Sequence, residues 1–385
     1  TASLMYVAGS TPRWGKVDEG TTVTDYDDDS IARKVSLNNN FAHIEYADSK
    51  LNIIDTPGYA AFVSHARPAL RVADCALVVV DGVNGIEVQT EKTWSYANEF
   101  LLPRFMVINK LDKENSDFGH ALETATSSFA RSIVPFTLPI GSEANFKGVV
   151  DVVHQKAYEF DANGKAKEIP MPESGKDVFE RTRERLIEIV AESDDALMEK
   201  YFEDGTLPEE DIYPNLAKAI AKSKLCPVYA VSSTTLAGLS ILLDHIVEFA
   251  PNPATHEAEY GFADADLSGD RVKRKYSNDE PFSAYVFRTI ADPFAGRINV
   301  MKVVSGKVES DATVFNSTRD AQERLGALHV INGKTLEKVN SAQTGDIIAV
   351  VKLKDTQTGD TLCDKAKPIV YPKVEYPEAA IAFAI

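Results

Sequence analysis

Residues 51–58 are Leu51-Asn52-Ile53-Ile54-Asp55-Thr56-Pro57-Gly58, an apolar strand that ends in an acid and then turns at Pro-Gly. At the carboxyl end of a strand in an α/β sheet, an aspartate can hold Mg²⁺, usually through water, and a following glycine lets a backbone N–H approach a γ-phosphate. Asp-Thr-Pro-Gly is also compatible with an ordinary type I or type II turn. The stretch therefore becomes informative only together with a second one.

The second stretch is Val107-Ile108-Asn109-Lys110-Leu111-Asp112, which again lies at the end of an apolar strand. The Asp112 carboxylate can accept hydrogen bonds from N1–H and the exocyclic amine of a guanine, the Asn109 amide can bond the opposite edge, and the Lys110 stem can pack over the ring. Alone, Asn-Lys-Leu-Asp is equally compatible with a helix N-cap. The two motifs in this order, 54 residues apart, favour a guanine-nucleotide site.

Two weaker signals fit the same site. Val231-Ser232-Ser233 ends a further apolar strand, where a backbone N–H and a small side chain can contact the guanine oxygen, although serine is common at such boundaries. Ser36 precedes the strand expected near Phe41, and its hydroxyl could complete the Mg²⁺ coordination when a loop closes. A solvent-facing serine at position 36 is equally compatible with the sequence.

Strand and helix patterns alternate from Phe41 to Ile108 and return after Leu225. The alternation predicts an α/β domain with a parallel sheet covered by helices. A hairpin is expected around Ala47-Asp48-Ser49, and the β-branched run at 76–80 predicts a strand buried on both faces. The expected strands are 42–46, 50–54, 76–80, 104–108 and 225–231, and the expected helices are 86–100 and 239–249.

The rest of the chain divides into three further parts. Apolar residues at helical spacing between about 138 and 227 predict one or two amphipathic helices, and the acidic stretch 192–211 is either a solvated face or a docking surface for a basic partner. The pattern is all β from Pro281 onward, which predicts a small barrel. The expected barrel strands are 282–288, 297–304, 312–315, 322–330 and 346–351. The expected domains are 1–253, with an insertion at about 138–227, a linker at 254–280, a barrel at 281–372 and the start of a third domain at 373–385.

Composition limits the classes of partner. The net charge of −17, from 41 basic and 58 acidic residues, disfavours indiscriminate binding to DNA and to anionic membranes, although a local basic patch can still contact a ribonucleoprotein. Cys75, Cys226 and Cys363 lie far apart, which argues against a disulfide framework or zinc ribbon and favours a reducing compartment. No apolar run approaches the ~20 residues of a membrane span, and no secretory signal is visible.

The motifs and their surroundings resemble the elongation factor G family of translational GTPases over essentially the whole chain. The segment at about 138–227 matches the insertion that distinguishes this family among GTPases. The resemblance is carried by residues 20–26, 53–59, 60–63, 71–81, 85–91, 109–113, 138–141, 146–152, 292–297 and 358–362.

The resemblance implies a Ras-like P-loop GTPase domain, here expected to lack its first strand and phosphate loop, with an α+β insertion, followed by a translation-type β-barrel. It implies GTP hydrolysis in the elongation (translocation) step, GTP or GDP and Mg²⁺ as cofactors, and the ribosome, with its RNA and proteins, as partner. It further implies a cytoplasmic monomer that binds neither DNA nor membrane. The implied GTP-binding residues are Asp55, Thr56, Pro57, Gly58, Asn109, Lys110, Asp112, Ser232 and Ser233; Ser36 and Asp55 are the implied Mg²⁺ residues.

Three departures from the family pattern stand out. The 385 residues contain no Gly-x₄-Gly-Lys-[Ser/Thr] phosphate loop, so we expect this chain to bind GTP poorly or not at all. Tyr59 stands where the family usually has the histidine that orients the attacking water, which puts hydrolysis in doubt. Lys34 stands at a position of the switch segment usually held by glycine.

Several alternatives remain open. The chain could come from a ribosome-protection or release-type factor, from a GTP-binding ribosome-associated factor that does not hydrolyse GTP, or from a barrel-bearing protein that never binds nucleotide. Both ends look cut, because residues 1–9 resemble the second half of a helix and 379–385 stop within an apolar stretch. The seven histidines are scattered without a His-x₃-His pair and predict no metal site. The basic cluster at 271–275 is expected in a solvated loop, or in contact with ribosomal RNA.

Overall fold

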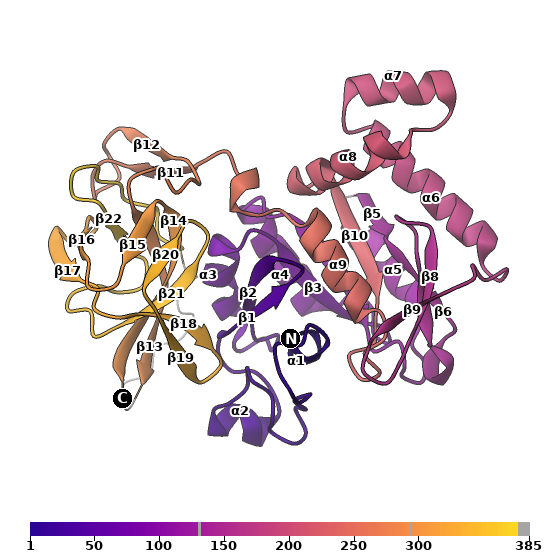
Figure 1. Cartoon of the computed structure of the whole chain (residues 1–385), viewed down its shortest axis with the longest axis horizontal. Helices are drawn as coiled ribbons and strands as arrows, with labels where there is room; N and C mark the ends of the chain where they lie inside the picture. Colours follow the sequence, from indigo (N-terminus) through magenta and orange to yellow (C-terminus); the bar gives the residue numbers. More distant parts are fainter. Residues whose placement is uncertain (130–131, 293–294, 376–385) are drawn as a thin grey trace. The chain divides into compact units, whose positions relative to one another are not determined.

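A computed structural model describes residues 1–129, 132–292 and 295–375 (Figure 1). The chain forms two compact units, each assembled from separate segments. The first unit contains Thr1–Val35, Ala42–Asp55 and Ala73–Asn252, and the second contains Ser36–Phe41, Thr56–Val72 and the described residues from Pro253 onward. The expected strand end at 379–385 lies outside the described residues.

The first unit is built on a four-stranded parallel sheet with the order β3-β4-β10-β5. Its strands are β3 (Ala76–Asp81), β4 (Arg104–Asn109), β10 (Leu225–Ala230) and β5 (Ser132–Pro135). Helices α4 (Val88–Glu99) and α5 (Phe118–Ser128) connect its strands, and α9 (Leu239–Phe249) follows the last of them. The predicted strands and helices of this region are confirmed to within a few residues, whereas β5 and α5 were not predicted.

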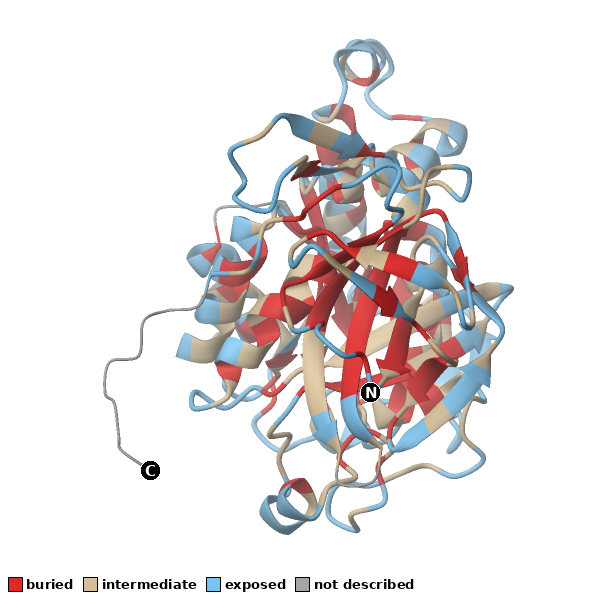
Figure 2. Ribbon diagram, turned by 90° about the vertical axis from the view of Figure 1, so that its left-hand side faces the viewer, coloured by how far each residue is buried: buried red, intermediate tan, exposed pale blue. Residues whose placement is uncertain are grey.

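Strand β4 shows why the central strands are apolar along their whole length. Phe105 and Val107 belong to one buried cluster and Met106 and Ile108 to another, because alternate residues of a strand point to opposite faces of the sheet. Both faces are therefore covered by apolar side chains, as expected for a parallel sheet. In Figure 2 the buried residues follow the strands, while the exposed ones gather on loops and outer helix faces.

Strand β3 corrects one expectation. The run at 76–80 predicted burial on both faces, but Leu77 is 37% and Val79 58% exposed. The two residues share one face of the strand, and that face is left uncovered at β3, which pairs with β4 alone among the described strands and lies at the edge of the sheet. Only alternate residues such as Val80 are buried.

The predicted hairpin is confirmed as a separate two-stranded sheet of β1 (Asn40–Tyr46) and β2 (Ser49–Asp55). Its turn is made by Ala47 and Asp48, whose φ angles of 46° and 57° match a type I′ turn. This turn suits the right-handed twist of the two strands. Asp55 is the last residue of β2.

The N-terminal segment and the insertion contain most of the remaining helices. Helix α1 (Ala2–Val7) is followed by Gly9 at φ 75°, which confirms the predicted glycine at a helix end, and α2 (Asp28–Arg33) begins at the N-cap Asp27. The insertion combines an antiparallel sheet with helices, which confirms its expected α+β character. Its charged segment forms two helices that break at the N-cap Asp194, followed by a third. These elements are β6 (Thr137–Ile140), β7 (Gly148–Asp151), β8 (Lys156–Phe160), β9 (Ala166–Ile169), the 3₁₀ turn η2 (Glu143–Asn145), α6 (Lys176–Ala191), α7 (Asp195–Asp204) and α8 (Glu209–Ala221).

The second unit is dominated by an eight-stranded antiparallel sheet with the order β17-β16-β22-β13-β14-β21-β18-β19. Its strands are β13 (Ser283–Asp292), β14 (Gly296–Ser305), β16 (Thr313–Asn316), β17 (Ala321–Arg324), β18 (Leu328–Asn332), β19 (Thr335–Val339), β21 (Ile347–Val351) and β22 (Thr361–Cys363). Strands β15 (Lys307–Glu309) and β20 (Ser341–Gln343) pair separately. The all-β prediction is confirmed, but the expected strand at 322–330 is two strands, because the chain turns at Gly326 with φ 61°.

Two further parts of this unit differ from expectation or were not predicted. The expected linker contains η3 (Pro253–Thr255) and an antiparallel pair, β11 (Glu259–Phe262) and β12 (Arg271–Arg274), so its basic cluster is not simply a solvated loop. Earlier in the chain, η1 (Val63–His65) and α3 (Ala66–Val72) pack with the unit, and Lys302 of β14 donates to the Val72 carbonyl at 2.7 Å. No helix among the described residues is both long enough and apolar enough to cross a bilayer.

Candidate guanine-nucleotide site

The carboxyl ends of β4 and β10 bring two loops together. Because the two strands are parallel neighbours, the residues after Ile108 and after Ala230 lie at the same edge of the sheet. The backbone continues this pairing beyond the strands, since the Val231 N–H donates to the Ile108 carbonyl at 3.0 Å. The loops that carry Asn109–Asp112 and Ser232–Ser233 are thereby held side by side.

Asn109 and Ser233 form a reciprocal pair. The backbone N–H of Ser233 donates to Asn109 Oδ1 at 2.9 Å, and Asn109 Nδ2 lies 3.1 Å from Ser233 Oγ. The Asn109 amide therefore ties the β10 loop to the β4 loop. One hydrogen of its NH₂ group is left for a ligand, since an amide nitrogen carries two donors.

Asp112 and Ser232 form the second link. Ser232 is fully buried and donates from Oγ to Asp112 Oδ1 at 2.6 Å. The same Oγ accepts the backbone N–H groups of Thr234 at 3.2 Å and Thr235 at 3.0 Å. This network fixes the Asp112 carboxylate while Oδ2 has no partner among the described residues. Oδ2 is therefore an available acceptor in a fixed orientation.

Lys110 takes a strained backbone conformation between these two residues. Its φ is 64°, in the left-handed region that non-glycine residues rarely adopt, and its Nζ lies 2.6 Å from Asp81 Oδ2. Burial alone would raise the pKa of Asp81, but the hydrogen bond and charge of Lys110, together with the backbone N–H groups of Val83 and Asn84, outweigh it and the pKa is lowered. The Asp81 carboxylate thus stays ionised and anchors the lysine at the end of β3.

Asp81 and Gly82 are site residues that sequence reasoning missed. Gly82 packs so closely on the β4 loop that a Cβ at this position would lie 2.9 Å from both the Asn109 carbonyl oxygen and Leu111 Cδ2. Its N–H also donates to that carbonyl at 2.8 Å. The available signal was the sequence Val80-Asp81-Gly82, an acid and a glycine at the end of a third parallel strand.

No described contact joins the other predicted site residues to the loops that carry Asn109–Asp112 and Ser232–Ser233. Asp55 ends β2 in the first unit, whereas Ser36 and Thr56, Pro57, Gly58 and Tyr59 belong to the second unit. Tyr59 is 62% exposed. Lys34 caps α2 with φ 57°, so the backbone here adopts the conformation that glycine prefers although the residue is lysine.

Comparison with known proteins places this arrangement in a family. Residues 1–252 match the elongation factor Tu GTP binding domain, and residues 281–365 match elongation factor G domain 2. The chain belongs to the elongation factor Tu GTP-binding-domain family. The resemblance to elongation factor G and the predicted fold class, a translational GTPase domain followed by a β-barrel region, are confirmed.

Similar proteins match over the whole chain. Elongation factor G of Thermotoga maritima is 35% identical over 387 residues, which cover 100% of this chain and 56% of that protein. Elongation factor G of Thermotoga neapolitana is 36% identical and is covered to 55%. A crystal structure of a protein from Thermus thermophilus superposes with a TM-score of 0.87 at 30% identity, covering 99% of this chain and 54% of that one. The chain thus spans about half the length of the relatives it matches.

Proposed function

We propose that the chain is the guanine-recognising part of a translational GTPase that acts in the elongation step on the ribosome, as elongation factor G does. The observation that carries the proposal is the pair of links between Asn109 and Ser233 and between Asp112 and Ser232. They hold an amide and a carboxylate side by side, the donor and acceptor set that a guanine edge requires. Membership of the family and the similarity of the whole chain to about half of elongation factor G support the same conclusion.

The proposed roles follow the chemistry of each residue. Asp112 accepts from N1–H and the exocyclic amine of guanine, Asn109 bonds the opposite edge, and the Lys110 stem covers the ring, with Ser232 and Ser233 supporting the base. Asp55 and Ser36 offer oxygen donors, which Mg²⁺ prefers, and Thr56, Pro57 and Gly58 form the turn beside the γ-phosphate. GTP or GDP and Mg²⁺ are the proposed cofactors, and the ribosome is the proposed partner of a cytoplasmic monomer.

A second candidate function is a factor that binds GTP on the ribosome without hydrolysing it. Tyr59 favours this candidate, because a phenol is a poor general base at neutral pH and its side chain is exposed. A ribosome-protection or release-type factor has no specific observation in its favour.

Phosphate release by the complete gene product separates the two candidates. We expect purified ribosomes to stimulate release of phosphate from GTP well above the rate of either component alone. The matched control is the same reaction with ATP, which should give only background. Nucleotide binding without stimulated release would instead establish the non-hydrolysing candidate, and failure to bind guanine nucleotide would overturn both.

A further inference from the structure

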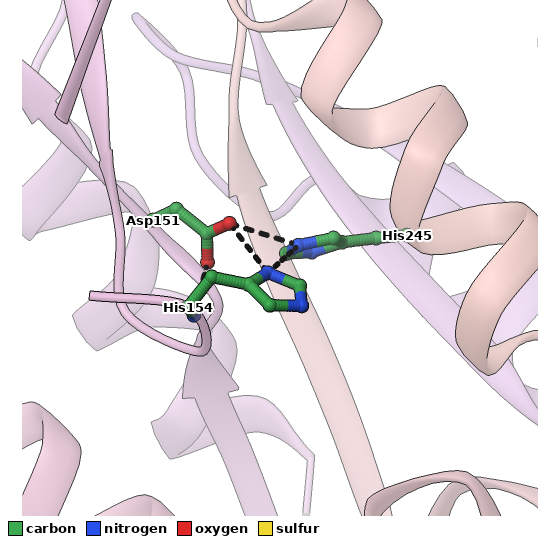
Figure 3. A group of neighbouring side chains, drawn as sticks. All are labelled: Asp151, His154 and His245. Carbon is green, nitrogen blue, oxygen red and sulfur yellow. Dashed lines mark hydrogen bonds and ion pairs between the residues drawn. The ribbon is translucent and has the colours of Figure 1, made fainter. Parts of the chain in front are cut away.

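Three side chains from distant parts of the sequence meet in the first unit, outside the guanine site. Asp151 ends β7, His154 lies three residues further on, and His245 is on α9 (Figure 3). Asp151 Oδ2 lies 2.8 Å from His154 Nδ1 and 3.2 Å from His245 Nε2, and the two ring nitrogens are 3.2 Å apart. Two of the histidines from which the sequence predicted no metal site are thus brought together with a carboxylate.

Hydrogen bonds account for only two of the three contacts: both rings can donate to Asp151 Oδ2, but the two ring N–H groups then lie 3.2 Å apart with no bond between them. A ring N–H points along one direction and can aim at one acceptor only, so three mutual contacts cannot all be linear hydrogen bonds. A cation bound to all three atoms at once accepts one lone pair from each and removes the contact between two donors. The point equidistant from the three atoms lies roughly 1.8 Å from each, so an ion at the usual zinc distance of about 2.0–2.1 Å would sit about 1 Å outside their plane.

The surroundings hold the three side chains in place for such a role. Asp151 Oδ1 accepts the backbone N–H groups of Val153 at 2.9 Å and His154 at 3.1 Å, which leaves Oδ2 turned toward the rings. His154 Nε2 lies 3.3 Å from a carboxylate oxygen of Glu248. A histidine that donates its outer N–H to a carboxylate keeps its inner nitrogen free for a metal, an arrangement common to metal-binding histidines.

The cluster opens on a pocket of about 260 Å³, which leaves room for a water molecule as a further ligand. His245 is 1% exposed and packs edge-on against Phe136 and Phe249, so its ring cannot turn away. Its outer nitrogen, Nδ1, has no partner among the described residues. Of the two histidines, only His154 therefore has a carboxylate, that of Glu248, behind its ring.

Two other charged side chains line the pocket, and both have partners. The Lys156 ammonium pairs with Glu168 at 3.0 Å, and Asp244 accepts a hydrogen bond from the Tyr46 hydroxyl at 2.7 Å. The cluster itself carries one carboxylate and two imidazoles, with Glu248 behind them. The local charge therefore suits a divalent cation.

We propose that Asp151, His154 and His245 form a binding site for a divalent transition metal ion, with Zn²⁺ the best match to two imidazoles and one carboxylate. The ion would join the turn after β7, in the insertion, to α9 of the nucleotide-binding domain. A ligand that binds only the folded chain stabilises it, so the site would act as a staple between these two elements. The guanine-site residues take no part in it.

A proton competes with the metal for His154. The hydrogen bonds to Asp151 and Glu248 raise the pKa of His154 to about 10 in the metal-free chain. The metal must displace that proton, as metals generally do at protein ligands. Titrations are therefore best made at about pH 8, where the competition is weaker than at neutral pH.

The test is a titration of the chain with Zn²⁺, and with Co²⁺ as a spectroscopic probe. We expect one equivalent of Zn²⁺ to bind, Co²⁺ to give the intense visible absorption of a four-coordinate site, and Tm to rise with Zn²⁺. His154→Ala should weaken binding by at least about 100-fold, and Glu248→Gln by about 10- to 100-fold, since a second-layer partner is worth that much. The control is His120→Ala, which removes an exposed histidine of the same unit.

His245→Phe serves as a second ligand variant that keeps the ring packing, in case other replacements at this buried position unfold the chain. Circular dichroism of each variant without metal shows whether it is folded. Folded wild-type chain that takes up no stoichiometric Zn²⁺ would mean that the cluster is only a hydrogen-bonded ion pair. Equal Zn²⁺ affinity in wild type and His154→Ala would also overturn the proposal.

Discussion

Replacing Asp112 with asparagine is expected to weaken the binding of guanine nucleotides to the complete gene product by about 100-fold or more. The carboxylate accepts from two donors of the base, and asparagine turns one acceptor into a donor that faces the guanine amine. Hydrogen bonds to a charged group contribute about 1.5–3 kcal/mol each, so losing one, weakening the other and opposing two donors together cost about 3 kcal/mol, or two powers of ten. Adenine nucleotides, which bind through other contacts, should be affected little.

The matched control is Glu114→Gln, which removes the same charge two residues away at an exposed position. It should leave the affinity for GDP within about twofold, since surface charges at this distance contribute little. A fluorescent GDP analogue and competition with unlabelled GDP and ADP measure both variants. If Asp112→Asn kept its preference for guanine, Asp112 would not contact the base and the proposed orientation of the site would be wrong.

The second large effect is expected at Tyr59. Replacing it with histidine should raise ribosome-stimulated phosphate release by the complete gene product by about tenfold or more, because a positioned imidazole can orient or activate water and such groups contribute about 10²–10⁴-fold. Stability should change little, because the side chain is 62% exposed. Single-turnover release of phosphate from GTP is the measurement, since it separates chemistry from nucleotide exchange.

Tyr59→Phe is the control for this prediction. It removes only the hydroxyl, so any fall in rate measures what the tyrosine contributes through a bound water. If Tyr59→His and wild type release phosphate at the same rate, then the tyrosine is not the departure that limits hydrolysis.

The sequence predicted most of the nucleotide-binding sheet because the signals were local. The run Phe105–Ile108 is short, uninterrupted and apolar, which is typical of a strand buried on both faces, and the polar residues after it mark the loop. Neighbouring parallel strands bring such loops to one edge, so Asp112 and Ser232 could be expected near each other although 120 positions separate them.

Features set by distant contacts could not be predicted in this way. The apolar run around Val79 predicts a buried side chain, but its exposure depends on what covers that face of β3 at the edge of the sheet. His154 and His245 are 91 positions apart with no spacing rule, and only the packing of the insertion against α9 brings their rings together. The Lys110–Asp81 ion pair likewise follows from the order of the strands and has no local motif.

We propose that these 385 residues recognise guanine although they contain no phosphate-loop motif. Ligand-detected NMR titration of the chain with guanosine, GTP and adenosine tests it most directly. We predict weak binding of guanosine and GTP, with affinities within about tenfold of each other, and weaker binding of adenosine, because the guanine contacts remain while the backbone cradle and lysine of a phosphate loop are absent. Tight binding of GTP, or equal binding of guanosine and adenosine, would contradict the account.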